Sequence, residues 1–207
     1  MLDNYRTEIN NEEIVTPAII KERALKLLQD DLAKYKLKLG DEEEGKLYDV
    51  KKDIYRLGDR ILDALADYYG ISSEQGEPSI TVWQKIEKMR KAKLLSEKGA
   101  QHLKEAISIT TELRLNAYCQ NESQTENIQT FMPAVGHLTE KEQHKLIKET
   151  FHIKYTNTLH HFYYVMLPVQ EIIKFFCNQS SHDIAEINLK YHDLYNNSEY
   201  NQGMVHA

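Results

Sequence analysis

The sequence predicts an all-α fold, a helical bundle of about six or seven helices, and three observations lead to this prediction. The 207 residues include only 8 glycines and 4 prolines, and these separate long segments in which apolar residues recur every three or four positions. No segment shows the alternation of apolar and polar residues that is typical of strands joined by hairpin turns. No repeat of about 20 to 50 residues is visible, so a solenoid is not expected.

The first half of the chain is expected to contain four helices. Thr16 and Pro17 are typical of a helix start, because threonine caps the first turn and proline fits the first helical position. Gly40 marks the end of this first helix, near residue 39. The other three helices are expected at about 46–69, 81–92 and, after the capping residue Ser96, 97–119.

The second half is expected to continue the bundle. Thr139 and Glu142 form a capping box, which predicts a helix from residue 139 to about Met166. Pro168 is expected to kink or break that helix, after which the apolar pattern continues into a further one. A last helix is expected at about 181–195.

These elements indicate one domain. Residues 1–120 are interpreted as a helical module and residues 121–207 as the closing helices of the same domain, with a frayed tail over 196–207. The polar stretch 120–130 is expected to be a loop, and so is the acidic run 41–44.

Composition excludes several classes of protein. The formal charge of −6, with 41% hydrophobic and 28% charged residues, argues against a disordered chain and gives no strong indication of nucleic-acid binding. Two cysteines, Cys119 and Cys177, are too few for a disulfide scaffold, so a cytoplasmic location is expected. No run of about 18 apolar residues is present, and the polar start is unlike a secretory signal, so no membrane span is expected.

Catalytic and cofactor motifs are not found. The sequence lacks a phosphate-binding P-loop, a His-Glu-x-x-His motif and paired Cys-x-x-Cys motifs, so neither a metal nor another cofactor is expected. His182-Asp183 and His192-Asp193 resemble the dyads of metal-dependent phosphohydrolases of the HD type. A hydrolase is therefore kept as one alternative, against the simpler interpretation that Asp183 caps a helix.

The most informative cluster lies in the second expected helix. Lys52, Arg56 and Arg60 are spaced by four residues, so they line one helical face, where ammonium and guanidinium groups are suited to bind phosphate or carboxylate. Tyr55 offers a stacking surface beside them, and Arg114 is expected to dock this helix on the fourth. The competing interpretation is a salt-bridged surface in which neighbouring acids pair with these cations, namely Asp49, Asp53, Asp59 and Asp63.

Three stretches carry a family resemblance, namely DVKKDIYRLGDRILDALADYY at 49–69, TVWQKIEKMRKAKLLS at 81–96 and AQHLKEAISITTELRLNAY at 100–118. Together they resemble the helical substrate-binding region that follows the catalytic domain in nucleotidyltransferases similar to the enzyme that uridylylates the PII signalling protein. The resemblance covers roughly residues 15–120 and matches polar positions of that region at Lys52, Arg56 and Arg114. This chain lacks the Gly-Ser turn and paired acids of the catalytic half.

The resemblance implies a non-catalytic accessory module that docks on a nucleotidyltransferase-like catalytic domain and helps to hold an acceptor protein or a nucleotide. A second hypothesis is a protein–protein interaction module, because aromatic residues suit interfaces and six tyrosines fall in the C-terminal third. These are Tyr155, Tyr163, Tyr164, Tyr191, Tyr195 and Tyr200.

Overall fold

The computed structural model describes residues 17–35, 37, 47–71, 79–122, 127–129, 139, 151–152, 156–178 and 189–206. The fold is all-α, as the sequence predicts, with six α-helices in these residues. They are α1 (Pro17–Lys34), α2 (Arg56–Tyr68), α3 (Val82–Lys91), α4 (Glu97–Asn121), α6 (Thr156–Cys177) and α7 (Glu199–His206). A π-helix, η1 (Val50–Tyr55), leads directly into α2.

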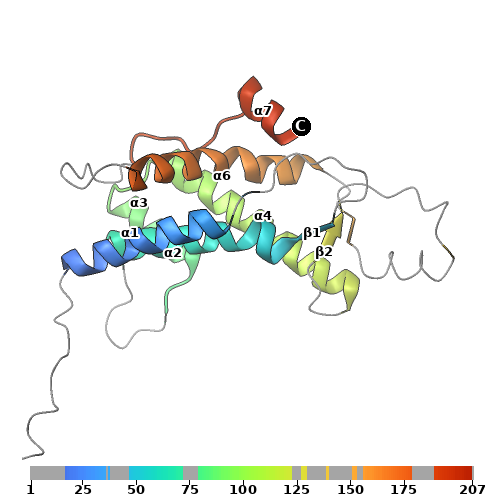
Figure 1. Ribbon diagram of the computed structural model, residues 1–207, viewed down its shortest axis with the longest axis horizontal. Helices are drawn as coiled ribbons and strands as arrows, with labels where there is room; N and C mark the ends of the chain where they lie inside the picture. Colours follow the sequence, from blue (N-terminus) through green and yellow to red (C-terminus); the bar gives the residue numbers. More distant parts are fainter. Residues whose placement is uncertain are drawn as a thin grey trace, which may run out of the picture.

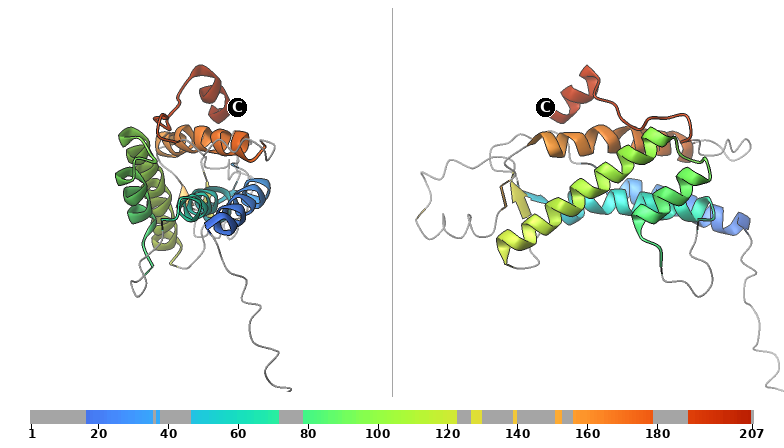
Figure 2. Two further views of the ribbon diagram at one scale, coloured as in Figure 1. Left: turned by 90° about the vertical axis from the view of Figure 1, so that its left-hand side faces the viewer. Right: turned by 180° about the vertical axis from the view of Figure 1, so that it is seen from behind.

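The helices pack around one apolar core (Figure 1). Helix α1 lies along α2, helix α4 packs against α3 and α6, and α6 contacts both α1 and α4. Seen end-on in Figure 2, the α1–α2 pair lies below α6, the α3–α4 pair flanks them on one side, and α7 lies above α6. The largest fully buried side chains come from α1, η1, α2, α3, α4 and α6, and they include Leu28, Ile54, Ile61, Tyr68, Ile86, Leu103 and Phe162.

One glycine allows α2 to approach its neighbours closely. A Cβ atom on Gly58 would lie 3.3 Å from Cδ1 of Ile107 on α4 and 3.6 Å from the methyl carbon of Met166 on α6. The first distance is tighter than ordinary contacts in a close-packed interior. Gly58 therefore sets the separation at the point where three helices meet.

The predicted starts of α3 and α4 are confirmed. Thr81 accepts a hydrogen bond from the Gln84 backbone N–H, and the Gln84 side chain accepts one from the Thr81 N–H, which completes a capping box. Ser96 caps α4 by accepting from the backbone N–H of Gly99 at 2.8 Å. Helix α1 begins at Pro17, the predicted first helical residue, whereas the predicted capping residue Thr16 lies outside the described residues.

The region expected to begin the second helix differs from the prediction. Leu47–Asp49 form a short strand, β1, which pairs antiparallel with β2 (Asn127–Gln129); β2 in turn pairs parallel with β3 (Phe151–His152). Strands of two or three residues are too short to give a visible alternation, so the sequence pattern did not reveal them. The loop predicted for 120–130 thus contains a strand, and residues 151–152, predicted to be helical, also form a strand.

Pro168 lies inside α6 and does not end it. Proline has no N–H, so the carbonyl of Tyr164, four residues earlier, loses its usual helical donor. The backbone N–H of Asn196 donates to that carbonyl at 2.9 Å. A segment from the C-terminal region therefore replaces the missing hydrogen bond, and the helix continues.

The C-terminal region also differs from the prediction. The helix expected at 181–195 is not present over 189–195, which crosses α4 as an irregular segment; residues 181–188 lie outside the described residues. Leu189 pairs with Leu95 as an isolated bridge, and Leu189 and Leu194 are buried. In the tail expected to fray, residues 199–206 form α7, and Asn201 is buried with its amide donating to the Asn196 carbonyl.

No helix in the described part of the chain is long and apolar enough to cross a membrane.

Candidate functional site

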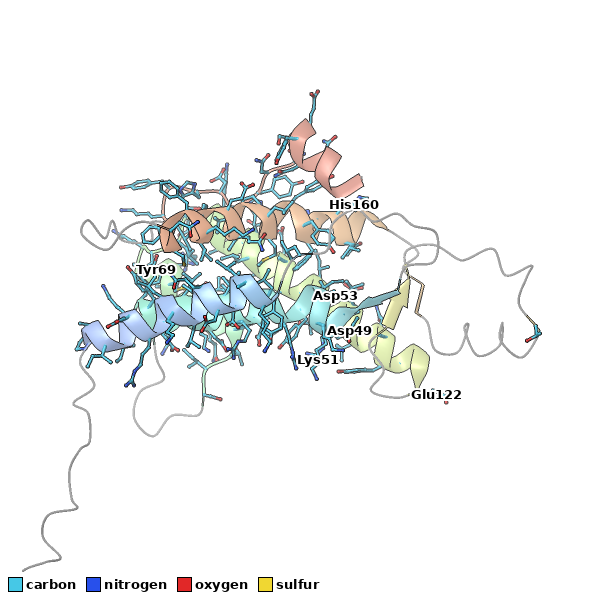
Figure 3. All side chains as sticks on the ribbon, in the orientation of Figure 1. Asp49, Lys51, Asp53, Tyr69, Glu122 and His160 are labelled. Carbon is cyan, nitrogen blue, oxygen red and sulfur yellow. The ribbon has the colours of Figure 1, made fainter. Side chains whose placement is uncertain are left out.

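The three basic residues predicted to line one face each have a partner within the chain. Lys52 is the most exposed, with 70% of its side chain accessible, and its ammonium lies 3.0 Å from the Asp49 carboxylate. Asp49 also caps η1 by accepting from the Lys52 backbone N–H. Figure 3 shows Asp49, Lys51 and Asp53 together where β1 meets η1. This exposed pair contributes little to stability.

Arg60 contacts α1, and Arg56 contacts Tyr35, the residue that follows this helix. The Arg60 Nε donates to the Asp31 carboxylate at 2.9 Å, and the Asp31 side chain is only 7% exposed while that of Arg60 is 48% exposed. Arg56 hydrogen-bonds Tyr35; although burial acts to raise the pKa of Tyr35, hydrogen bonds and positive charge from Lys34 and Arg56 lower it overall. These two arginines therefore join α1 to α2.

Tyr55 and Arg114 meet on the other side of the helix. The guanidinium carbon of Arg114 on α4 lies 4.2 Å from the centre of the Tyr55 ring, close enough for a cation–π interaction. The same group lies 5.8 Å from the ring of Tyr118 and donates to the Tyr118 hydroxyl at 3.0 Å. All three side chains are half-buried. Arg114 thus docks α4 on η1, as the sequence predicts, through aromatic rings.

Two carboxylates extend this cluster along α2. Asp59 accepts a hydrogen bond from the Tyr55 hydroxyl; burial and the neighbouring Asp63 charge raise the pKa of Asp59, and this bond and the charges of Lys85 and Arg114 offset the rise only in part. Burial and the charge of Asp59 likewise raise the pKa of Tyr55. Lys85 on α3 neutralises Asp63 at 2.6 Å. The local charge is therefore balanced.

The five predicted site residues thus divide into two groups. Lys52, Arg56 and Arg60 line one side of η1 and α2, where Arg60 contacts α1 and Arg56 contacts Tyr35 just after it. Tyr55 and Arg114 form the other group with Tyr118, which sequence reasoning missed. The spacing of Arg114 and Tyr118 by four residues on one helix is the sequence signal that could have revealed their contact.

A third cluster joins α4, α6 and the C-terminal segment. His161 on α6 contacts the Glu105 carboxylate at 3.0 Å, and the His161 and His102 rings lie 5.3 Å and 5.1 Å from the ring of Tyr195. Burial acts to raise the pKa of Glu105, but hydrogen bonds from Gln101 and His161 lower it overall. No local motif links these residues, because helix packing alone brings them together.

Metal chemistry finds no support in the described part of the chain, where no three His, Cys, Asp or Glu residues are placed to hold an ion. His192 and Asp193, one of the two candidate dyads, lie in the irregular segment, and Asp193 pairs with Lys98 at 3.3 Å. The other dyad, His182 and Asp183, lies outside the described residues. Burial raises the pKa of the Cys177 thiol, which disfavours the reactive thiolate.

The Tyr55–Arg114–Tyr118 group is chemically suited to recognition. A guanidinium presents a planar set of donors that match phosphate or carboxylate, and tyrosine rings offer stacking surfaces. Comparisons of this chain with protein-family models, curated proteins and solved structures find no match.

Proposed function

We propose that this chain is a non-catalytic helical accessory module of a nucleotidyltransferase-like protein, and that it contacts a nucleotide through Tyr55, Arg114 and Tyr118. The observation that carries the proposal is the placement of the Arg114 guanidinium against two tyrosine rings at the junction of η1 and α4. Phosphate oxygens are the natural partners of the guanidinium, and a base is the natural partner of an aromatic ring.

Two further features support this location. Tyr55 ends a π-helix, a rare conformation that often occurs at functional sites. In contrast, the Arg60 guanidinium is engaged by the buried Asp31, so we assign Arg60 a structural role. Because Asp59 and Asp63 balance the charges of Lys85 and Arg114, the attraction for a polyphosphate is expected to be modest, with a Kd of about a millimolar.

The experiment is a titration of the full chain with UTP, followed by NMR, with and without Mg²⁺. Wild type is compared with Arg114→Gln, Arg114→Lys and the control Arg23→Gln, which changes an exposed arginine on α1. We expect Arg114→Gln to weaken binding about fivefold to tenfold, and Arg114→Lys to restore only part of it, since lysine lacks the planar fork.

The proposal fails if UTP causes no saturable shifts up to about 10 mM, well above the expected Kd. It also fails if Arg114→Gln and Arg23→Gln weaken binding to the same extent.

A protein–protein interaction module is the second candidate, and exposed aromatic side chains favour it. Phe175, Tyr191 and Tyr200 are 68%, 76% and 70% exposed, whereas Tyr163 is buried; Tyr155 lies outside the described residues. Affinity purification from source cells of the wild type and a Phe175→Asp, Tyr200→Asp variant tests this candidate. A protein retained by the wild type and lost by the variant would support it, and identical retention would count against it.

A further inference from the structure

A basic surface with an exposed aromatic ring lies where the C-terminal segment crosses the start of α4. The bridge between Leu95 and Leu189 brings together two stretches that are far apart in the sequence. The contacts of His192 confirm this placement, since its carbonyl accepts from the Ser96 hydroxyl at 2.8 Å. We define the basic surface by five exposed residues: Lys93, Lys98, Lys190, Tyr191 and His192.

Two of these lysines occupy positions that local energetics disfavour. Lys93 has φ of 59°, in the left-handed region that favours glycine, and a lysine there costs about 1 kcal/mol. Lys98 lies in the first turn of α4, where the helix dipole disfavours a cation. Helix stability therefore does not account for these two lysines. Residues that depart from local preference are expected at functional sites.

Other basic residues nearby have a simpler explanation. Lys88, Arg90 and Lys91 lie in the last turn of α3, where cations complement the helix dipole. Arg90 is also held by Glu87 and Glu97. The inference therefore rests on the five residues of the basic surface and on no others.

Tyr191 distinguishes this surface from a merely solvated group of lysines. Its side chain is 76% exposed, and the Lys190 ammonium lies 5.5 Å from the centre of its ring. An aromatic ring beside cations is the arrangement that binds single-stranded nucleic acids, in which bases stack on the ring and phosphates pair with the lysines. An acidic peptide would pair with the lysines in the same way, but only a nucleic acid also supplies bases that stack on the ring.

The overall charge of −6 does not prevent such binding. At physiological salt the screening length is about 8 Å, so a strand on this surface interacts mainly with the charges nearest to it. In the described part of the chain, the acids next to the surface are Glu97 and Asp193, and they pair with Arg90 and Lys98. We propose that the basic surface binds single-stranded nucleic acid, an interaction separate from nucleotide contact at Arg114.

The test is fluorescence anisotropy of a labelled 12-nucleotide oligo(U) mixed with the full chain. Since Lys98 is paired with Asp193, contact of Lys93 and Lys190 with two phosphates predicts a slope of log K against log salt of about −1.4, so binding weakens about sevenfold from roughly 50 to 200 mM salt. Lys93→Glu with Lys190→Glu is expected to weaken binding at least tenfold. The matched control, Lys26→Glu with Lys174→Glu, reverses two exposed lysines on α1 and α6 and is expected to weaken it less than twofold.

The tyrosine gives a second test that does not depend on net charge. Tyr191→Ala is expected to weaken binding about tenfold through lost stacking, and Tyr191→Phe to retain it. Because Tyr191 is so exposed, these variants keep the proposal testable if the lysine variant fails to fold. Arg114→Gln is expected to leave oligo(U) binding unchanged, which separates this proposal from the proposed function.

Four outcomes would overturn the proposal: no binding of oligo(U) at low salt, equal losses in the lysine variant and its matched control, unchanged binding by Tyr191→Ala, or equally tight binding of a 12-residue poly-glutamate peptide. The last result would assign the surface to an acidic protein segment.

Discussion

An arginine makes contacts on each side of the η1–α2 helix, Arg60 from α2 itself and Arg114 from α4, but the partners of the two arginines differ. On the α1 side, Arg60 meets the Asp31 carboxylate, which is almost fully buried. On the α4 side, Arg114 lies over the ring of Tyr55 and donates to the Tyr118 hydroxyl. A buried carboxylate needs a neighbouring cation to offset the cost of burying its charge, whereas an aromatic ring carries no charge to offset. The comparison teaches that the partner, more than the charge of the arginine itself, distinguishes the structural role assigned to Arg60 from the binding role proposed for Arg114.

Removing the cation on the α1 side is expected to have the largest effect. Arg60→Ala leaves the Asp31 carboxylate buried without its cation, and we expect a loss of about 2 kcal/mol in the free energy of unfolding. Breaking a fully buried pair costs roughly 3 to 5 kcal/mol, and the loss here is smaller because Arg60 is half-exposed. Urea unfolding monitored by circular dichroism measures the change.

The control for this prediction is the double variant Asp31→Asn, Arg60→Ala, which removes the charge together with its partner. We expect it to recover at least half of the lost stability. A loss below about 0.5 kcal/mol for Arg60→Ala alone would place Arg60 among ordinary surface residues and would remove the contrast between the two sides.

The pH dependence of stability sharpens the comparison on the α4 side. The pKa of Asp59 is raised above its ordinary value of 3.8, mainly by burial and the charge of Asp63. The folded state therefore holds this proton more tightly than the unfolded state, and stability falls as pH rises from about 3.8 through the folded pKa. Asp59→Asn is expected to remove that fall.

Urea unfolding of wild type and Asp59→Asn at a series of pH values provides the measurement. The stability of the variant relative to wild type should increase between about pH 4 and neutrality, with little difference near pH 3. A difference that is constant over this range would mean that Asp59 is as well solvated in the folded chain as in the unfolded one.

The smallest effect is expected at Lys52. Its salt bridge with Asp49 joins residues three apart on the surface, and the lysine side chain is 70% exposed. Lys52→Ala should therefore change the free energy of unfolding by less than about 0.5 kcal/mol in urea. A loss of stability as large as that of Arg60→Ala would show that Lys52, and not Arg60 alone, supports the fold.

Features encoded within a few residues could be predicted from the sequence. The capping residues Thr81 and Ser96 and the apolar periodicity of α2 and α4 follow from local rules, and the structure has helices at these places. Interactions between distant residues could not be predicted. Nothing near Pro168 indicates that the Asn196 N–H, 28 residues later, supplies the donor that lets α6 continue.

The candidate site shows the same limit. The four-residue spacing of Lys52, Arg56 and Arg60 does place them on one side of η1 and α2. Periodicity alone, however, does not say which helix packs against that side. One clue was present: Asp31 lies on the same face of α1 as the buried residues Ala24, Leu28 and Leu32. An acid on an apolar face requires a cation from a neighbouring helix, and Arg60 is that cation.

The division of roles between Arg60 and Arg114 is tested most directly by observing the arginine side chains themselves. In the full chain with ¹⁵N-labelled arginine, the Nε–H resonances are followed during a titration with UTP. The account predicts a saturable shift for Arg114 and almost none for Arg60, whose Nε donates to Asp31 throughout. A saturable shift at Arg60 or Arg56 with none at Arg114 would contradict it.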